Sequence, residues 1–372
     1  TNAELKALVD DMFMDDTVDF LEEMPANVVK KVLQNADEGT RKTINQFLNY
    51  PENSAGSLMT IEYVDLHDYF TVRKAMDYIR RTGIDKETVY TCYVIDDQRK
   101  LVGQVSLRKL IIAPESACIR DIMDTNIVSA VTTDDQEAVA DDFRRYDLTS
   151  IAVCDKEGRL VGIITIDDIV DVIQDENTED IKKMAAIIPS DEDYMKTSVW
   201  SLVAHRLPWL MLLMISATFT STIITHFETL LSGAVLLTAF IPMLMDSAGN
   251  SGSQTSVTVI RNLALGEIEL RDWPHVLAKE IGVAIVSGAA LALVNFLRII
   301  IFTSTSMMIA AVVSVTLFCT VIIAMIVGCL LPIGAKKLGF DPAVMASPMI
   351  TTIVDACSLM IYFLIATSML GL

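Results

Sequence analysis

Charge divides this chain into two parts that cannot share one solvent. Residues 1–199 hold 40 of the 48 acidic and 22 of the 29 basic residues of the 372-residue chain, a net charge of −18. Residues 200–372 hold only 8 acidic and 7 basic residues and are otherwise largely apolar. The apolar part suits hydrocarbon and the acidic part needs water. The sequence therefore predicts an acidic water-soluble body followed by a membrane domain.

The overall composition excludes several classes of protein. The net charge of −19 argues against a nucleic-acid partner, because nucleic-acid-binding proteins are usually basic. The 6 cysteines are scattered without a Cys-x-x-Cys pair, which predicts free thiols and neither a disulfide scaffold nor a zinc site. We see no nucleophile–base constellation and no phosphate-cradling loop, so we do not expect an enzyme.

The soluble part is expected to lie in the cytosol. We find no signal peptide ahead of it that would carry it across a membrane. The sequence begins with Thr1 and lacks an initiating methionine, which predicts that part of the N-terminal domain is absent.

Five apolar stretches follow one another in the membrane part, each about long enough to cross a ~30 Å hydrocarbon core. They are residues 204–226, 232–260, 276–300, 308–334 and 344–370. With the soluble part in the cytosol, the outer connections hold a single basic residue, Arg298, and the inner ones hold Arg206, Arg261, Arg271, Lys279, Lys336 and Lys337. The positive-inside rule predicts this orientation in a plasma or inner membrane, with the C-terminus outside.

The second apolar stretch is unusually polar for a membrane segment. It brings Asp246 and Asn250, four residues apart on one helical face, to membrane depth beside Gly249 and Gly252. Polar groups are tolerated there only where they meet protein or a water-filled cavity. The small residues would also suit close packing of two helices. The stretch is therefore a candidate pore lining, with helix packing as the alternative for its glycines.

Asp355 is the only formal charge of the last stretch, with Thr351 and Ser358 about one turn to either side. A carboxylate among hydroxyls suits a hydrated divalent cation, because hard cations take oxygen ligands and Mg²⁺ keeps much of its water. The alternatives are an ion pair, a protonated carboxyl or a proton relay. The basic side chains and histidines of this part lie near the ends of the stretches, so we predict that Asp355 binds a cation on a conduction path.

The soluble part contains an internal repeat with a period of 59 residues. Residues 93–111 and 152–170 each read as strand, acidic turn, strand and helix, and both contain Leu-Val-Gly. This pattern resembles a tandem pair of CBS domains, here residues 53–116 (first copy) and 117–172 (second copy). In that family a Gly-x-x-Ser/Thr-x-x-Asp run binds a ribose. The second copy has Thr165 and Asp168, which implies ATP as a possible regulatory ligand, whereas the first has Lys109 at the acidic position.

Acidic helices flank the repeat. Residues 1–52 read as short amphipathic helices. Residues 173–199 read as an acidic connecting helix, which we expect to continue to Ile188 and stop at Pro189. A charge run is usually a solvated face. Carboxylates crowded between two bodies would instead repel unless divalent cations lay between them, so the connecting helix is a candidate cation sensor.

The order of these parts resembles the MgtE family of magnesium channels along essentially the whole chain. The most specific motifs are residues 245–254 with 265–273, and residues 341–363. The resemblance implies a multi-domain α plus α/β fold. Its parts are a short helical N-domain (1–52), the tandem CBS pair (53–172), a connecting amphipathic helix (173–199) and a five-span α-helical transmembrane pore domain (200–372).

The resemblance also implies a function. It implies a homodimeric Mg²⁺-selective channel, with hydrated Mg²⁺ at Asp355 and a path lined by Thr351, Asp246, Gly249 and Asn250. Negative feedback by cytosolic Mg²⁺ would act through acids that carry over to Asp135, Glu137, Asp147, Asp168, Asp171, Glu176, Glu179 and Asp180. An ion-coupled divalent-cation carrier and a nucleotide-sensing membrane protein without transport remain alternatives. Ligand type alone does not rank Mg²⁺ against Mn²⁺, Co²⁺ or Ni²⁺.

Overall fold

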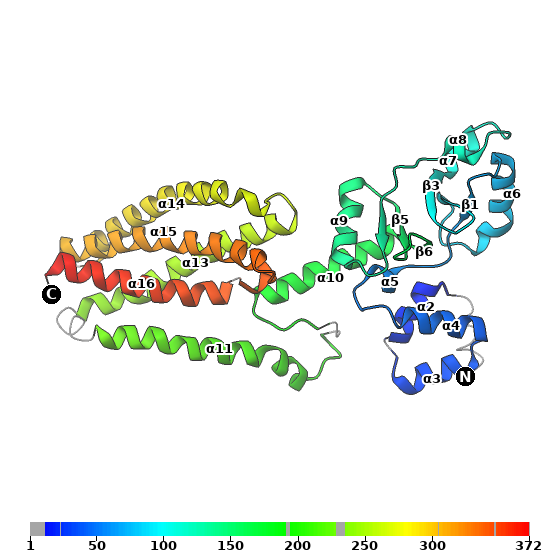
Figure 1. Cartoon of the computed structure of the whole chain (residues 1–372). Coiled ribbons are helices and arrows are strands. Elements are labelled where there is room, and N and C mark those ends of the chain that lie inside the picture. Colours follow the sequence, from blue (N-terminus) through cyan, green and yellow to red (C-terminus); the bar gives the residue numbers. More distant parts are fainter. Residues whose placement is uncertain are drawn as a thin grey trace. The chain divides into compact units, whose positions relative to one another are not determined.

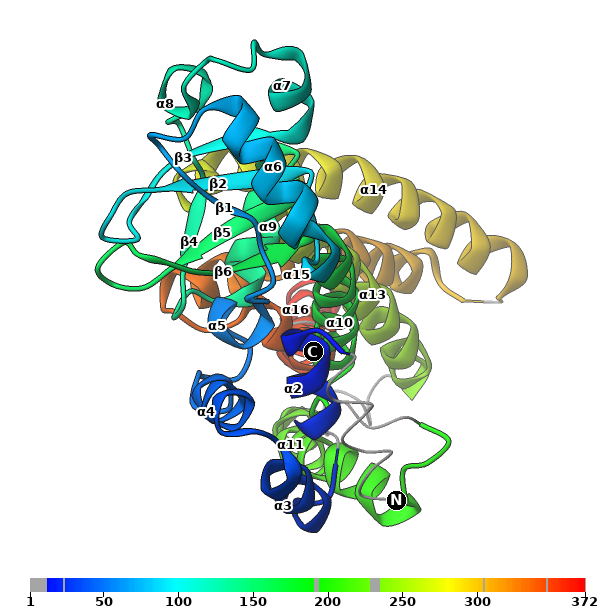
Figure 2. The same cartoon turned by 90° about the vertical axis from the view of Figure 1, so that its right-hand side faces the viewer.

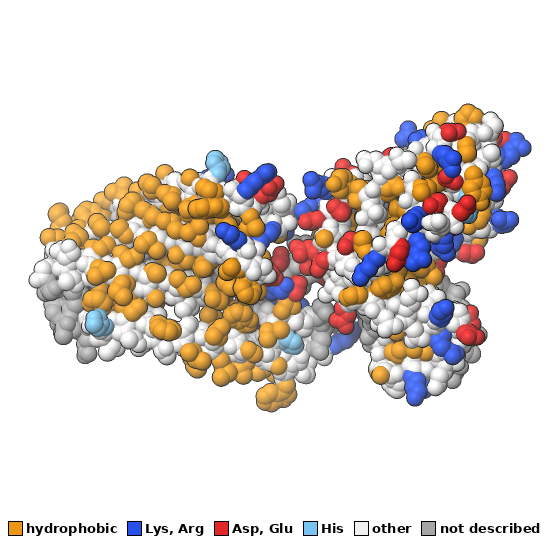
Figure 3. All heavy atoms as spheres, viewed as in Figure 1, with side chains coloured by type: hydrophobic (Ala, Val, Ile, Leu, Met, Phe, Trp, Pro, Cys, Tyr) orange, Lys and Arg blue, Asp and Glu red, His pale blue; other side chains and the backbone are white. Residues whose placement is uncertain are grey.

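The structure, a computed structural model, describes residues 12–22, 24–190, 194–227, 235–303, 305–345 and 347–371 (Figure 1). The chain divides into two units, Thr1–Glu176 and Asn177–Leu372. Figure 3 shows how differently they are built: hydrophobic side chains cover most of the visible surface of the second unit, and charged side chains are frequent on the first. The fold therefore has two parts, as the charge predicts, but they divide after Glu176, 23 residues before the predicted boundary at residue 199.

The first unit begins with short helices, as the amphipathic pattern predicted. They are α2 (Met14–Glu22), α3 (Ala26–Asn35) and α4 (Glu38–Phe47). The side chain of Asp37 caps α4 by accepting a hydrogen bond from the Thr40 backbone N–H. Leu21, Val32 and Ile44 are buried together between the helices. The apolar residues of these three helices therefore form a small hydrophobic core of their own.

The two repeat copies have the same sheet topology (Figure 2). Each is a three-stranded sheet whose first pair of strands is parallel and whose second pair is antiparallel. The register shifts at the equivalent point in both, between Val94 and Ile95 and between Val153 and Cys154. The strands are β1 (Asp65–His67), β2 (Thr91–Ile95), β3 (Leu101–Ser106), β4 (Ser129–Val131), β5 (Ser150–Cys154) and β6 (Leu160–Thr165).

Helices lie at equivalent places in the two copies, one before the first strand, one after it and one after the third. The first copy has α5 (Ala55–Leu58), α6 (Val72–Thr82) and α7 (Leu107–Ile112), and the second has α8 (Ile119–Ile122), α9 (Gln136–Tyr146) and α10 (Ile166–Met184). Thr71 and Asp135 cap α6 and α9 through their side chains. The 59-residue repeat is thus one supersecondary unit used twice.

The glycine of each Leu-Val-Gly run accommodates a methionine from the segment at the beginning of the other copy. A Cβ atom on Gly103 would lie 2.5 Å from Met123 Sδ, and one on Gly162 would lie 2.6 Å from Met59 Sδ. The same segments form backbone bridges, Thr60 to Ile163 and Gln104 to Asp124. Each copy is therefore completed by chain that belongs to the other.

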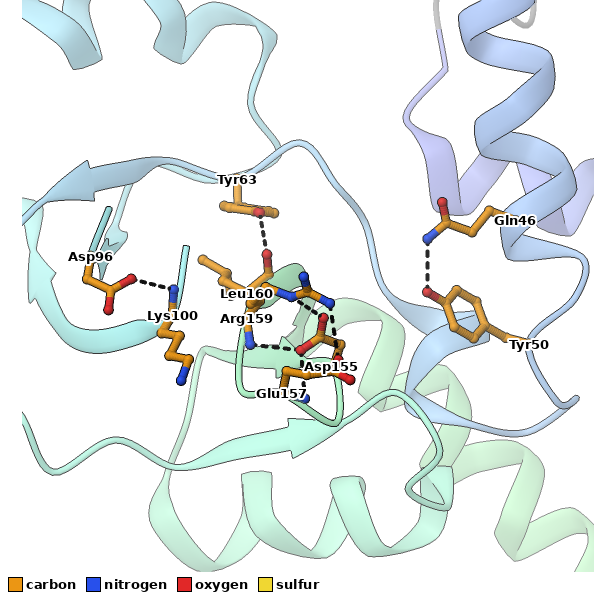
Figure 4. A network of polar contacts seen from close by, with 9 residues as sticks. All are labelled: Gln46, Tyr50, Tyr63, Asp96, Lys100, Asp155, Glu157, Arg159 and Leu160. Atoms are coloured by element: carbon orange, nitrogen blue, oxygen red, sulfur yellow. Dashed lines mark hydrogen bonds and ion pairs between the residues drawn. The ribbon is translucent and has the colours of Figure 1, made fainter. Parts of the chain in front are cut away.

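The acidic turns of the two copies also meet, and their acids are structural (Figure 4). Arg159 pairs with Asp155 (Nε to Oδ2, 2.7 Å) and with Glu157 (Nη2 to Oε2, 3.1 Å). The Tyr63 hydroxyl donates to the Leu160 carbonyl at 3.3 Å. Asp96 accepts a hydrogen bond from the Lys100 backbone N–H at 2.9 Å. These turn carboxylates are engaged in holding the turns together.

Helix α10 runs without a break from Ile166 to Met184, so it begins inside the second copy and contains most of the predicted connecting helix. It ends four residues before the expected Ile188. Ala186 has a positive φ of 55°, and the Lys182 ammonium donates to the Ser190 carbonyl. The turn at Ala186 therefore ends the helix before Pro189 can.

The second unit consists of long helices, which are α11 (Val199–His226), α13 (Ile241–Ala264), α14 (Trp273–Phe302), α15 (Met307–Lys337) and α16 (Ser347–Leu370). Short helical turns precede three of them, η2 (Val235–Phe240), η3 (Leu270–Asp272) and η4 (Pro342–Met345). Helix α15 is largely buried and packs against α13, α14 and α16. The Tyr362 hydroxyl donates to the Leu237 carbonyl at 2.9 Å, and Phe227 stacks on Phe363.

By length and composition, four helical segments of the described chain can cross a membrane: 199–226, 270–302, 307–337 and 342–370. Helix α13 is not among them, because polar side chains lower its hydropathy. The membrane character of the second unit is thus confirmed, and a crossing by α13 remains a prediction.

Candidate functional site

The two carboxylates singled out in the membrane part lie on neighbouring helices. Asp246 is on α13 and Asp355 on α16, and these helices pack together. The Asp246 carboxylate is close enough to that of Asp355 for a coulombic interaction. A Cβ atom on Gly249 would lie 3.2 Å from Thr351 Cγ2, one turn before Asp355. The structure therefore brings the predicted α13 and α16 residues together.

Helix α13 carries a continuous polar stripe. Asp246, Asn250, Gln254 and Thr258 follow one another at intervals of four residues, and all four are exposed. Residues at this spacing share one face of a helix. In a membrane, such a face is stable only against water or another protein surface. The stripe is therefore the part of the second unit least suited to contact with lipid.

The glycines of α13 have a different role from the stripe. Gly249 and Gly252 are buried, and a Cβ atom on Gly252 would approach Ile350 Cγ2 at 2.9 Å and the Ala324 carbonyl oxygen at 3.0 Å. Gly328 of α15 packs directly on the Gly252 backbone. These contacts are the close helix packing considered as the alternative for the small residues.

The hydroxyls around Asp355 are not equivalent. Thr351 is half-buried, and its Oγ1 donates to the Pro348 carbonyl at 3.0 Å. Ser358 is only 2% exposed and lies inside the packed helices. Thr351, and not Ser358, therefore remains available beside Asp355 for an ion and its water.

Sequence reasoning missed one intramembrane carboxylate, Glu280 of α14. Its Oε2 accepts a hydrogen bond from Thr255 Oγ1 of α13 at 3.1 Å, and Thr255 is buried. Glu280 lies inside the predicted third stretch, which was the available signal. The contact lies on the buried side of α13, so it fixes α13 against α14.

In the second copy, Thr165 and Asp168 meet as the CBS motif predicts. Thr165 Oγ1 donates to Asp168 Oδ2 at 2.8 Å. Burial raises the pKa of Asp168, and the nearby carboxylates of Asp167 and Asp16 raise it further, although the hydrogen bonds from Thr165 oppose this. A cation would lower the energy of this crowded negative charge.

The same place gathers further acids that were not among the predicted site residues. Asp15 of α2 is only 8% exposed. Burial raises its pKa to about 7; the Asp16 backbone N–H opposes this, and the charges of Asp168, Asp16 and Glu87 add to it. Burial likewise raises the pKa of Glu87, and the negative charges of Asp167, Asp168, Asp16 and Glu62 raise it further. Because the three-dimensional contact of α2 with the second copy creates this cluster, spacing within α2 gave no sign of it.

The other predicted sensing acids are placed one by one along α9 and α10. Asp135 caps α9, Asp147 ends it in the left-handed region, and Glu137 is exposed. Glu176 accepts a hydrogen bond from Gln136 Nε2 at 2.7 Å. Asp171 is exposed and Asp180 is half-buried on α10.

Glu179 already has a cationic partner. Lys183 Nζ lies 2.8 Å from Glu179 Oε1 and 2.7 Å from Asp341 Oδ2. Although burial opposes it, hydrogen bonds to Asp341 and Glu179 raise the pKa of Lys183 above its usual value. Across the described part of the chain, no three His, Cys, Asp or Glu side chains are arranged to hold a metal ion. The predicted sensing acids therefore do not form a complete ion site within the described residues of a single chain.

Family models match the N-terminal, CBS and C-terminal parts of the chain, and residues 176–240 lie outside the matches. Residues 241–365 match the MgtE family model, described as a divalent cation transporter, and residues 1–53 match the MgtE intracellular N domain. Residues 55–116 and 119–175 match CBS domains. Matches to enzymes cover at most 34% of the chain and concern its CBS domains alone.

Individual relatives extend over most of the chain. The magnesium transporter MgtE of Thermus thermophilus is 37% identical over 334 residues, which are 90% of this chain and 74% of the relative. The magnesium transporter MgtE of Bacillus subtilis is 35% identical over 95% of this chain and 78% of its own length. A crystal structure of the cytosolic domain of the Mg²⁺ channel MgtE in complex with ATP is 38% identical, covers 45% of this chain and 69% of its own, and has a TM-score of 0.44.

Proposed function

Because this chain belongs to the MgtE family of magnesium transporters, we propose that it is a homodimeric channel that conducts Mg²⁺ across the plasma membrane. The family consists of membrane transporters of divalent cations and not of enzymes. In our proposal the second unit forms the pore and the first unit senses cytosolic Mg²⁺. The N-terminal and CBS domains lie in the cytosol and the C-terminus lies outside, as the distribution of basic residues favours.

The observation that carries the proposal is the exposed polar stripe of α13 beside Asp355. A helix with Asp246, Asn250 and Gln254 on one face needs water or protein along that face at membrane depth. Two protomers that face each other through α13 and α16 would enclose these oxygens around a common axis. Such a path lets a divalent cation pass with its water shell held by carboxylate and hydroxyl groups.

In this path Asp355 holds the hydrated ion and Thr351 and Asn250 line its approach. Asp246 adds negative charge beside Asp355, which raises the local concentration of cations. Gly249 contributes by letting α13 approach Thr351 closely. No proton-transfer group is needed, because the ion crosses with its charge compensated by fixed carboxylates.

The test is Mg²⁺ flux into liposomes that contain the purified chain. We expect Asp355→Ala to abolish flux while the protein still assembles, and Glu267→Gln, at an exposed residue between α13 and α14, to leave flux unchanged. Gln254→Leu should also lower flux, whereas a stripe that faced lipid would tolerate leucine. Flux through Asp355→Ala at the wild-type rate would refute the pore assignment. Flux that requires a Na⁺ or H⁺ gradient would favour the ion-coupled carrier.

We further propose that Mg²⁺ closes the channel through Asp135, Glu137, Asp147, Asp168, Asp171, Glu176, Glu179 and Asp180. In the described residues of one protomer, no three His, Cys, Asp or Glu side chains are arranged to hold a metal ion. We therefore assign the Mg²⁺ ions to places where acids of the two protomers meet, since only cations can stabilise such crowded negative charge. Closure at high cytosolic Mg²⁺ would give negative feedback.

Neutralising three of these acids together tests the sensor. Glu176→Gln, Glu179→Gln and Asp180→Asn should leave a channel that still conducts at millimolar Mg²⁺. A matched triple variant of exposed acids in the first copy, Asp77→Asn, Asp85→Asn and Asp97→Asn, should close normally. Equal Mg²⁺ sensitivity of both triple variants would remove α10 from the sensor.

ATP is proposed as a regulatory ligand at Thr165 and Asp168. The solved relative in complex with ATP supports this for the family's cytosolic domain. In this chain the support is the intact second-copy motif, whose Asp168 offers acceptor oxygens to a ribose, whereas the Lys109 ammonium in the first copy only donates. A chain that bound ATP but showed no flux in liposomes would be a nucleotide sensor without transport.

A further inference from the structure

A cavity of about 460 Å³ lies at the end of α14, where α14 meets the junction of η2 and α13. Its walls are mainly apolar and include Phe240, Met243, Ile299 and Phe302, and Arg298 is the only charged residue among the described residues that line it. Arg298 is 25 residues after Trp273, a distance of about 38 Å along an α-helix. Because this exceeds the hydrocarbon thickness, Arg298 reaches the headgroup level at the membrane face opposite the start of α14.

Buried polar groups orient the Arg298 side chain. Its Nη2 donates to Asn295 Oδ1 at 3.0 Å and lies 3.1 Å from Met243 Sδ. Asn295 is only 5% exposed, and its Nδ2 lies 3.4 Å from Ser314 Oγ of α15. The guanidinium is therefore fixed at the cavity by a chain of contacts that reaches into the helix core.

Arg298 has no acidic partner among the described residues. The ion pairs of that part of the chain do not include it, and no acidic residue occurs in the sequence between Glu280 and Asp341. A guanidinium has five N–H donors, of which the structure uses one nitrogen. An oriented cation with spare donors at headgroup level is suited to a phosphate group, which arginine binds in a bidentate manner.

We propose that this cavity binds an anionic phospholipid, with its phosphate on Arg298 and the start of an acyl chain along Phe240 and Phe302. A lipid fits better than soluble phosphate because the surroundings are apolar: Ile301 is 68% and Phe302 79% exposed. The outward-facing residues of α14 would then contact hydrocarbon while the guanidinium holds the headgroup. The site depends on the chain's spanning a membrane and not on its conducting Mg²⁺.

The test counts lipids on the full-length purified chain by native mass spectrometry after exposure to equal amounts of phosphatidylglycerol and phosphatidylcholine. We expect the wild type to retain phosphatidylglycerol and Arg298→Gln to bind it about tenfold more weakly, the effect of losing a charge-assisted hydrogen bond. Arg271→Gln, which removes an exposed arginine at the other end of α14, should bind like the wild type.

A second variant separates the acyl chain from the headgroup. Ala239→Trp should fill the cavity while leaving Arg298 in place, and we expect it to lose phosphatidylglycerol as well. Retention by Ala239→Trp or Arg298→Gln at wild-type affinity would overturn the proposal. Displacement of the lipid by 10 mM inorganic phosphate would assign the site to soluble anions. A wild-type dimer that retains no lipid would assign the cavity to the contact between protomers. Either result would also overturn the proposal.

Discussion

The two CBS copies share one topology and differ in charge at the same place. In the first copy, the pocket at the start of α7 is lined by Ser106, Arg108 and Lys109 and measures about 350 Å³. In the second copy, the equivalent positions to the two bases are Asp167 and Asp168. Ser106 accepts from the Lys109 backbone, whereas Thr165 donates to the Asp168 carboxylate. The apolar pattern fixes the fold, and the residues at the helix start decide which charge the copy favours.

The copies also differ in what covers them. Val18 and Phe47 of the N-terminal helices belong to the same buried cluster as Val139 and Ile164 of the second copy. The first copy instead exposes Ile84, Ile111 and Ile112. The apolar contact of the N-terminal helices is therefore mainly with the second copy, and the first copy contributes polar contacts such as Glu62, which accepts a hydrogen bond from the Met14 backbone N–H.

The largest effect should come from breaking this asymmetric contact. Val18→Asp would place an unpaired carboxylate in the cluster, and we expect it to destabilise the first unit by about 4 kcal/mol. Ile111→Asp, at a residue that is 66% exposed in the first copy, should cost almost nothing. Thermal unfolding of both variants compares them, and equal losses would mean that the copies are covered alike.

Glycine substitutions sharpen the comparison of the two Leu-Val-Gly runs. A Cβ atom on Gly162 would meet the Thr60 carbonyl oxygen at 2.8 Å as well as Met59, whereas the three atoms nearest to one on Gly103 all belong to the Met123 side chain. Backbone yields less than a flexible side chain, so we expect Gly162→Ala to cost about 3 kcal/mol and Gly103→Ala about 1 kcal/mol. The reverse order in a denaturant titration would contradict these contacts.

The strongest pH dependence is expected at Asp15, where α2 meets the CBS pair. Folding raises the pKa of Asp15 from 3.8 to about 7, so the folded state holds this proton more tightly than the unfolded chain. The contribution of Asp15 is therefore most favourable at low pH and is lost as pH rises through about 7. We expect about tenfold faster hydrogen exchange in α2 at pH 8 than at pH 6, after correction for intrinsic rates.

Asp15→Asn is the control for that measurement. It removes the titrating group and should leave exchange in α2 independent of pH over this range. Exchange in α6 of the first copy, which has no equivalent contact with the N-terminal helices, should not change in either protein. A slope that survives in Asp15→Asn would assign the effect to another group.

The smallest effect concerns ATP. We expect Asp168→Asn to weaken ATP binding about fivefold in calorimetry, because one charged acceptor for the ribose is lost. Lys109→Asn should leave the affinity unchanged if the second copy alone binds. A loss of binding in Lys109→Asn would reverse the assignment of the two copies.

Periodic patterns were sufficient to predict the elements that their own residues stabilise. The repeat, the amphipathic N-terminal helices and the apolar helices follow from local spacing, and the structure has them. The predicted end of α10 was wrong by four residues because Ala186 adopts a positive φ. Alanine rarely has this conformation, so the sequence gives no sign of it. Helix α13 was predicted as a span from its apolar ends, and its polar middle keeps it below the usual composition of one.

The site was predicted where it depends on one residue and missed where it depends on a contact. Asp355 and Asp168 stand out by residue type and motif. Asp15 and Glu280 become significant only through partners far along the chain, Asp168 and Thr255. Asp15 lies on an amphipathic helix, where a charged residue is usually solvated. Tertiary contacts of this kind have no local signature in the sequence.

The exchange of Met59 and Met123 between the repeat copies limits how the module can be taken apart. A protease fragment with a single copy would keep its glycine but lose the methionine that covers it, and one strand edge would be left open to solvent. Neither half of the module is therefore complete without the other. Unfolding of one half should carry the other with it in a single cooperative step.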